Sequence, residues 1–179
     1  MALPCELRVI RLTPALAEAA GALQVTMAQR AYVGDPAFNV VDMLRDPASE
    51  GMAILYGDAM IGSYRLDFSP NAVTGRPYAP ASVGLRAFLV DQRFQGRGLG
   101  VRAALALCED LRLRHPSRQV LLLAVHARNR AAIATYRAAG FADTGTWLAG
   151  GRAGPQHLML RTLGAPVAAP ARMGEWIHG

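Results

Sequence analysis

The chain has 179 residues, 52% of them hydrophobic, and a formal net charge of +6, with all 19 of its strongly basic residues being arginine. This length predicts a single globular domain with a sizeable core, and no apolar run approaches the roughly 20 residues of a membrane span. The arginines are scattered along the chain rather than gathered on one periodic face. We therefore expect neither a nucleic-acid partner nor a membrane partner.

Hydrophobic periodicity and turn residues divide the chain into alternating strands and helices. Thr13 and Pro14 are typical of a helix N-terminus, Gly57-Asp58 of a hairpin turn, and Gly140 of the position just after a helix. In chain order the predicted elements are a strand over 7–11, a helix over 14–30, a helix over 40–45, strands over 52–56 and 60–68, a loop over 69–80, a strand over 83–90, a helix over 101–114, a strand over 120–125, a helix over 130–139, and strands over 146–148 and 156–161.

The two cysteines, Cys5 and Cys108, fit neither a disulfide framework nor a metal site. Cys108 lies on the apolar stripe of the helix predicted over 101–114, so we expect a buried, inert thiol there. We expect no metal centre. Because residues 1–14 lack the apolar run of a secretory signal, we also expect a cytoplasmic protein.

A glycine-rich turn, Gln95-Gly96-Arg97-Gly98-Leu99-Gly100, connects the strand over 83–90 to the helix over 101–114. A turn of this kind leaves backbone N–H groups unpaired at a helix N-terminus, where the helix dipole adds partial positive charge. Glycine permits a positive φ and leaves room for an anion beside these amides. The turn therefore predicts a site for a phosphate or pyrophosphate.

Two common phosphate-binding motifs do not fit this turn. A P-loop needs a lysine, and the chain contains none. A dinucleotide-binding fingerprint needs its third glycine one residue later, and an acidic residue after the next strand. Here the strand over 120–125 leads into His126-Ala127-Arg128 without an acid. Neither an ATP site nor an NAD site is expected.

The segment from Leu89 to Gly100 resembles the acyl-CoA strand and pyrophosphate loop of the GNAT superfamily of acetyl-CoA-dependent N-acetyltransferases. A second segment, Asn129 to Phe141, is similar to the family's signature N-x-x-A-x-x-x-Y-x-x-x-G-F. Both occur in the family's order. One departure is Gln92, where many members have proline.

The resemblance implies an α/β (α+β) fold, in which a mixed, twisted central sheet of about seven strands carries helices on both faces. The domain is expected over residues 1–163. Residues 164–179, rich in Ala, Pro and Gly, are expected to form a frayed tail. The alternative is a tail that packs Trp176 on the domain or on a partner subunit, so a homodimer is considered as well.

The resemblance also implies acetyl-CoA as the co-substrate, and it assigns the residues that would bind it. The pantetheine arm would pair with the main chain of the strand over 83–90, with the Val90 amide near the thioester oxygen. Arg93, Arg97 and Arg102 are open alternatives for the adenosine phosphate. The implied cofactor-binding residues are Phe88, Leu89, Val90, Gln95, Gly96, Arg97, Gly98, Leu99, Gly100, Val101 and Asn129.

Tyr136 is the catalytic residue that the resemblance implies, as the general acid that protonates the departing thiolate. It follows Asn129 by seven residues, which places both on roughly one face of a helix. The phenol's ordinary pKa, about 10, suits this proton transfer. From the residues alone, Tyr136 also fits a core position and Asn129 an N-cap.

The general base and the acceptor are left open by the sequence. Glu50, Asp67, His126 and water are the alternatives for the base. For the acceptor we favour a primary amine of a small molecule, polyamine-like in kind. The alternatives are a protein N-terminal or peptide acetyltransferase and a non-catalytic acyl-CoA-binding sensor.

Overall fold

The structure is a computed structural model that describes residues 6–151 and 153–164. Its strands form one seven-stranded sheet in the order β1-β2-β3-β4-β5-β7-β6. The strands are β1 (Leu7–Arg11), β2 (Ser49–Tyr56), β3 (Ala59–Asp67), β4 (Ser82–Val90), β5 (Val120–His126), β6 (Ala142–Leu148) and β7 (Gln156–Thr162). The helices are η1 (Pro14–Leu16), α1 (Ala17–Gly21), α2 (Met27–Val33), α3 (Pro36–Arg45), η2 (Gln92–Phe94), α4 (Leu99–Arg114) and α5 (Arg130–Ala138).

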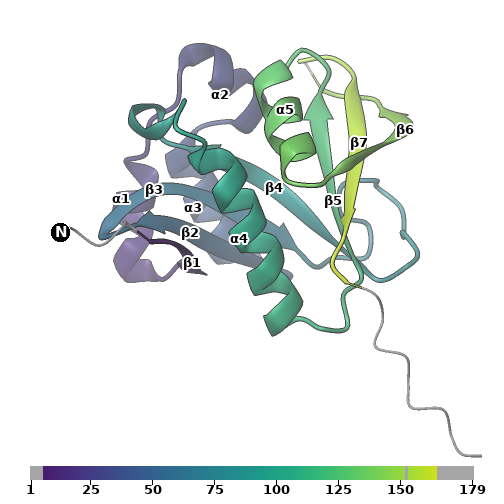
Figure 1. Ribbon diagram of the computed structural model, residues 1–179, viewed down its shortest axis with the longest axis horizontal. Coiled ribbons are helices and arrows are strands. Elements are labelled where there is room, and N and C mark those ends of the chain that lie inside the picture. Colours follow the sequence, from purple (N-terminus) through teal and green to yellow (C-terminus); the bar gives the residue numbers. More distant parts are fainter. Residues whose placement is uncertain (1–5, 152, 165–179) are drawn as a thin grey trace, which may run out of the picture.

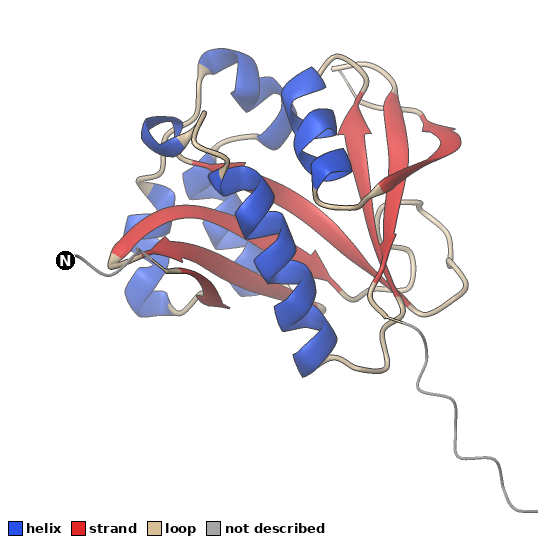
Figure 2. Ribbon diagram, viewed as in Figure 1, coloured by secondary structure: helices blue, strands red, loops and turns tan. Residues whose placement is uncertain are grey.

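Helices cover both faces of the sheet (Figures 1 and 2). α4 and α5 lie in front of it in this view, whereas α1 and α3 lie behind. β4 and β5 run parallel, and the other neighbouring strands are antiparallel. The predicted mixed, twisted sheet of seven strands with helices on both faces is therefore confirmed. Trp176 and the predicted tail beyond Gly164 lie outside the described residues.

The largest core cluster lies between the sheet and α4. Leu107 and Leu111 of α4 are fully buried there, against Leu121 and Leu123 of β5. Cys108 belongs to the same cluster, and burial raises the pKa of its thiol to about 11. The expected burial of Cys108 is confirmed, and the raised pKa disfavours the reactive thiolate form.

The single helix predicted over 14–30 is wrong, because the chain forms η1, α1 and α2 there, with a break over residues 22–26. Two contacts explain the break. The Gln24 main chain is held by Asp91 and Gln92, which no helical conformation of this segment would allow. Thr26 and Gln29 then begin α2 with a capping box, a signal that was present in the sequence as Thr-x-x-Gln.

Two other predicted elements were too short. α3 begins at Pro36 rather than at residue 40, because the Asp35 side chain accepts hydrogen bonds from the next turn and caps the helix. β6 begins at Ala142 rather than at residue 146. A register shift around Gly145, whose φ is +75°, lets the strand continue through residues that resemble a turn.

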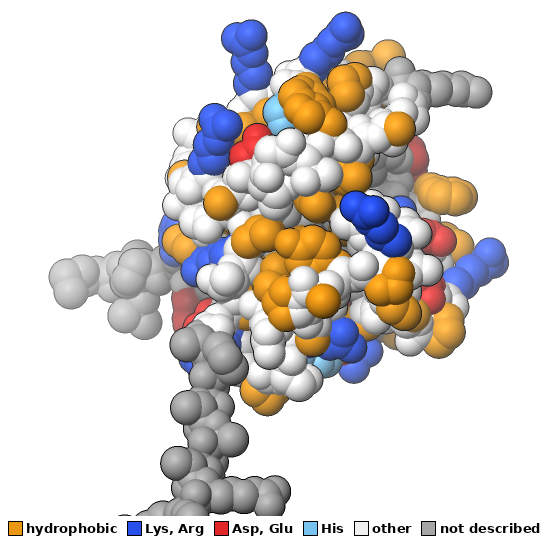
Figure 3. Space-filling view, turned by 90° about the vertical axis from the view of Figure 1, so that its right-hand side faces the viewer, with side chains coloured by type: hydrophobic (Ala, Val, Ile, Leu, Met, Phe, Trp, Pro, Cys, Tyr) orange, Lys and Arg blue, Asp and Glu red, His pale blue; other side chains and the backbone are white. Residues whose placement is uncertain are grey.

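Among the described residues, no helix has both the length and the hydropathy needed to cross a membrane. In the same part of the chain, no three His, Cys, Asp or Glu side chains gather as metal ligands do. On the side of the molecule shown in Figure 3, arginines stand apart from one another around hydrophobic groups.

Candidate active site

The site begins where β4 and β5 separate. Their pairing covers Ser82–Gly84 and Val120–Leu122 alone, so beyond these residues the two parallel strands diverge. A β-bulge bends β4 at this point: Ala87, at φ +49°, and Phe88 together lie opposite Tyr64 of β3. A positive φ is uncommon for alanine. The bend therefore opens a gap in the middle of the sheet.

The backbone of β4 presents unpaired amides to this gap. The Asp91 amide donates to the Ile61 carbonyl of β3 at 2.7 Å. Because hydrogen-bonding directions alternate along a strand, Leu89 faces β3 as well, whereas Phe88 and Val90 face the gap. These are the two residues whose main chains the family resemblance assigned to the pantetheine arm.

The glycine turn lies at the open end of the gap and begins α4. Gly96 and Gly98 have φ values of +75° and +71°, and a Cβ on either would meet no atom within 4 Å. Gly98 is the N-cap residue, so the first amides of α4, beginning with Leu99, have no acceptor within the helix. The turn therefore combines free donors with open space, as an anion site requires.

Gly100 has a second role, in helix packing, that its sequence motif did not indicate. A Cβ there would lie 3.4 Å from Cγ2 of Thr135 on α5. The absence of a side chain at this position thus lets α4 and α5 approach each other. Both helices contribute to the wall of the site.

Side-chain amides fix the turn to β4 and α2. Gln95 Nε2 donates to the Val90 carbonyl at 2.7 Å, and Gln95 and Gln29 exchange hydrogen bonds of 2.9 and 3.1 Å. The Val90 carbonyl is thereby satisfied, which leaves the Val90 amide as the unpaired group. Gln29 was not predicted as part of the site, because it lies 66 residues away in the sequence.

Asp91, directly after β4, binds the segment before α2 and the start of η2. Its side chain is fully buried and accepts hydrogen bonds from the Gln24 amide, the Arg93 amide and the Arg93 guanidinium. Burial alone would raise the pKa of Asp91, but these hydrogen bonds outweigh it and hold the pKa below its ordinary value. The carboxylate therefore stays ionised and rigid behind the glycine turn.

A cavity of about 850 Å³ follows the gap between β4 and β5. Arg97 and Leu99 are not part of its wall: the Leu99 side chain is buried in the core, and the Arg97 guanidinium lies 5.7 Å from the centre of the Phe94 ring. The other members of the implied cofactor-binding set line the cavity together with Tyr136, namely Phe88, Leu89, Val90, Gln95, Gly96, Gly98, Gly100, Val101, Asn129 and Tyr136.

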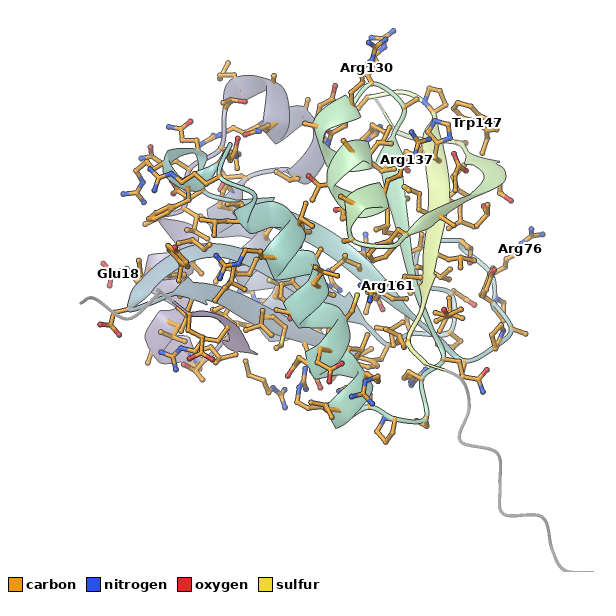
Figure 4. The ribbon with its side chains drawn as sticks, in the orientation of Figure 1. Glu18, Arg76, Arg130, Arg137, Trp147 and Arg161 are labelled. Atoms are coloured by element: carbon orange, nitrogen blue, oxygen red, sulfur yellow. The ribbon has the colours of Figure 1, made fainter. Side chains whose placement is uncertain are left out.

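Arg130 of α5 projects into solvent (Figure 4), whereas Tyr136, on the same helix, is buried. Its ring packs against Phe88 at 5.9 Å and Phe141 at 5.5 Å between centroids. Burial raises the pKa of the Tyr136 phenol above its ordinary value, so the hydroxyl stays protonated. Asn129 caps α5 through its Oδ1, 3.3 Å from the Ala132 amide, and also lines the cavity.

The three side chains considered as general base are placed very differently. Glu50 does not line the cavity, and it pairs with Arg114 and His115. Burial would raise the pKa of Glu50, but Arg114 and His115 lower it. Asp67 is buried outside the cavity wall and binds Ser69 and Arg86, which likewise lower its pKa against the effect of burial. His126 does line the cavity.

The comparisons with known proteins agree with this geometry. The sequence model of the Acetyltransferase (GNAT) family matches residues 21–141. No curated protein sequence matches the chain.

Solved structures similar to this chain include several acetyltransferases. The aminoglycoside acetyltransferase AAC(6')-Ib, in complex with paromomycin and acetyl-CoA, is 18% identical with a TM-score of 0.71, over 87% of this chain and 93% of that one. Spermidine N-acetyltransferase from Vibrio cholerae, in complex with CoA and spermine, is 15% identical with a TM-score of 0.65, over 88% and 95%. The GNAT domain of S. lividans PAT is 25% identical with a TM-score of 0.62, over 87% and 90%.

The separated strands, the glycine turn at the start of α4 and the family match over residues 21–141 lead to one assignment. This chain belongs to the GNAT family of acetyltransferases.

Proposed function

We propose that this chain transfers the acetyl group of acetyl-CoA directly to a primary amine of a small molecule within a ternary complex. The observation that carries the proposal is the gap between β4 and β5, which leads from the unpaired Phe88 and Val90 amides to the N-terminus of α4. A long ligand with an anionic end and an amide-bearing arm matches both parts. Acetyl-CoA supplies an activated acetyl thioester to such a site.

Each part of the wall has a distinct task in this proposal. The amides at the start of α4 bind the pyrophosphate. The Phe88 and Val90 main chains hold the pantetheine arm, and the Val90 amide polarises the thioester oxygen. Tyr136, whose hydroxyl stays protonated, is the proton donor to the sulfur. Asn129 Nδ2 is available to the arm, because Oδ1 is the atom that caps α5.

The acceptor side of the cavity bears on the choice of amine. A polyamine, the acceptor that the sequence favoured, needs several free carboxylates. Here Asp42, which lines the cavity, and Asp46, outside the wall, both bind the Arg65 guanidinium, and Asp67, also outside the wall, binds Arg86 at 3.2 Å. Because these charges are already neutralised, we place an amine with a single positive charge ahead of a polyamine.

The test is release of free thiol from acetyl-CoA with a panel of acceptors: ethylamine, glycinamide, spermidine, kanamycin and a short peptide with a free N-terminus. Amine-dependent thiol release, with a mass increase of the amine by one acetyl group, supports the proposal. Release with the peptide alone would favour the peptide acetyltransferase. CoA binding by thermal shift without thiol release would favour the acyl-CoA sensor and overturn the proposed activity.

A further inference from the structure

His126 ends β5 at the gap, on the wall of the cavity. The residue is 9% exposed, and its Nδ1 is buried without a hydrogen-bond partner among the described residues. A buried nitrogen left without a hydrogen-bond partner is unfavourable. Because the residue lines the cavity, a small rotation of its side chain would bring this nitrogen into contact with a bound group.

The side chain of His126 lies on the face of the sheet opposite to Tyr136. Side chains alternate between faces along a strand. On β5, Leu121, Leu123 and Val125 pack in the same core cluster as Tyr136. His126, one residue after Val125, therefore faces the other side. Its ring contact with Tyr32 of α2, 5.3 Å between centroids, agrees with this placement.

Acyl transfer to an amine requires proton-transferring groups on two sides of the reacting carbon. The base serves the incoming nitrogen, and the acid serves the outgoing sulfur. Tyr136 and His126 both line the cavity, on opposite faces of the sheet, at the point where β4 and β5 separate. Glu50 and Asp67 are excluded from this role, because neither lines the cavity.

We propose, on the basis of the proposed function, that the His126 imidazole is the general base that deprotonates the acceptor. Its unpaired nitrogen takes one proton from the ammonium group, directly or through one water. The freed lone pair forms the N–C bond to the acetyl carbon, the C–S bond breaks, and its electron pair leaves with the sulfur. Tyr136 gives its proton to that sulfur, the second proton of the amine returns to the Tyr136 oxygen, and His126 releases its proton to solvent.

Gln156 of β7 sets which ring nitrogen is free. Its side-chain amide lies 3.2 Å from His126 Nε2. With the amide oxygen turned toward the ring, Nε2–H donates to Gln156 and Nδ1 keeps its lone pair. Tyr32 is the titratable group that faces His126 from α2. The charged side chains that line the same cavity are Arg65, Arg86 and Asp42.

The experiment compares His126→Gln with His157→Gln, a control on β7 whose ring pairs with Asp143 and stacks on Trp147, outside the cavity wall. The probes are ethylamine, glycinamide and aminoacetonitrile, whose ammonium groups are progressively more acidic. At neutral pH, His126→Gln should lower kcat/KM for ethylamine by about 10²-fold. His126→Gln should lower kcat/KM much less for aminoacetonitrile, whose amine is already neutral at this pH. His157→Gln should leave kcat/KM unchanged for both amines.

Two further measurements separate a base from a structural role. Gln156→Glu should move the acidic limb of the kcat profile to higher pH, because a carboxylate stabilises the protonated ring. In the CoA complex, the ring resonance that disappears in His126→Gln should shift when ethylamine is added, with the His157 resonance unmoved.

An equal loss with all three amines, an unchanged pH profile in Gln156→Glu, or a ring resonance insensitive to amine would overturn the role of His126 while leaving acetyl transfer intact. Failure of the wild-type chain to acetylate any amine would instead overturn the proposed function, and the role of His126 with it.

Discussion

A valine at Gly98 should abolish CoA binding while leaving the fold intact. A Cβ at Gly98 meets no atom within 4 Å, so the added side chain causes no clash in the free protein. The backbone φ of +71° is unfavourable for a side chain and costs about 1–2 kcal/mol. For a domain of this size, that cost lowers Tm by roughly 2–8 °C.

The same valine would occupy the space beside the first amides of α4. CoA at 100 times its Kd stabilises the wild-type chain by about 2.7 kcal/mol, a rise in Tm of roughly 5–11 °C. The Gly98→Val chain should show no such rise. Thermal unfolding with and without CoA, and with ATP and NAD at the same concentration, measures both effects.

Gly145→Val is the matched control. Gly145 has φ +75° and also no atom within 4 Å of a Cβ, but it lies on β6, outside the cavity wall. The Gly145→Val chain should show a similar fall in Tm and keep the full rise in Tm with CoA. A CoA shift retained by Gly98→Val would refute the assignment of the anion site, and equal shifts from CoA, ATP and NAD would indicate unspecific anion binding.

Three other substitutions test the site and its support. Tyr136→Phe should lower kcat by roughly 10²-fold or more with little change in the acetyl-CoA KM, measured where chemistry limits turnover; near-wild-type kcat would remove Tyr136 from the mechanism. Gly62→Ala should destabilise by about 1–3 kcal/mol in urea unfolding, since its Cβ would lie 2.3 Å from the Leu89 carbonyl oxygen; an unchanged midpoint would show that β3 and β4 separate freely. Asp91→Asn should cost about 1–3 kcal/mol at pH 7. Because its native pKa is lowered, the ionised Asp91 contributes to stability above the unfolded pKa of about 4, and this contribution is lost as pH falls through the native pKa. The curves of Tm against pH for the wild-type and Asp91→Asn chains should therefore converge in acid. Parallel curves would contradict the role of the Asp91 charge.

Sequence-based prediction was most accurate for elements whose local motif agrees with the contacts that they make with distant parts of the chain. The Gly96–Gly100 turn and the Asn129–Phe141 helix carry their own signals, and both lie at the gap in the sheet. The break between α1 and α2 depends on Asp91, far along the chain, so helical periodicity could not reveal it.

The proposed general base is a similar case. The setting of His126 is formed by Tyr32 from α2 and Gln156 from β7, and it exists only once the sheet is assembled. Glu50 and Asp67 appeared equivalent to it in the sequence. Arg114, His115 and Arg86, which occupy those two carboxylates, come from other elements, so their pairing could not be predicted from local pattern.

The bulge at Ala87 reverses the alternation of side chains along β4. Before it, Val83 and Leu85 face α4; after it, Phe88 packs on that side and Leu89 on the other. The number of residues between Leu85 and Val90 is therefore fixed by function. Deleting Ala87 would remove the bulge and leave Phe88 and Leu89 on their present faces, but β4 would lose the bend that separates it from β5. A change in the length of this short stretch should therefore close the gap or move the Phe88 and Val90 amides out of it.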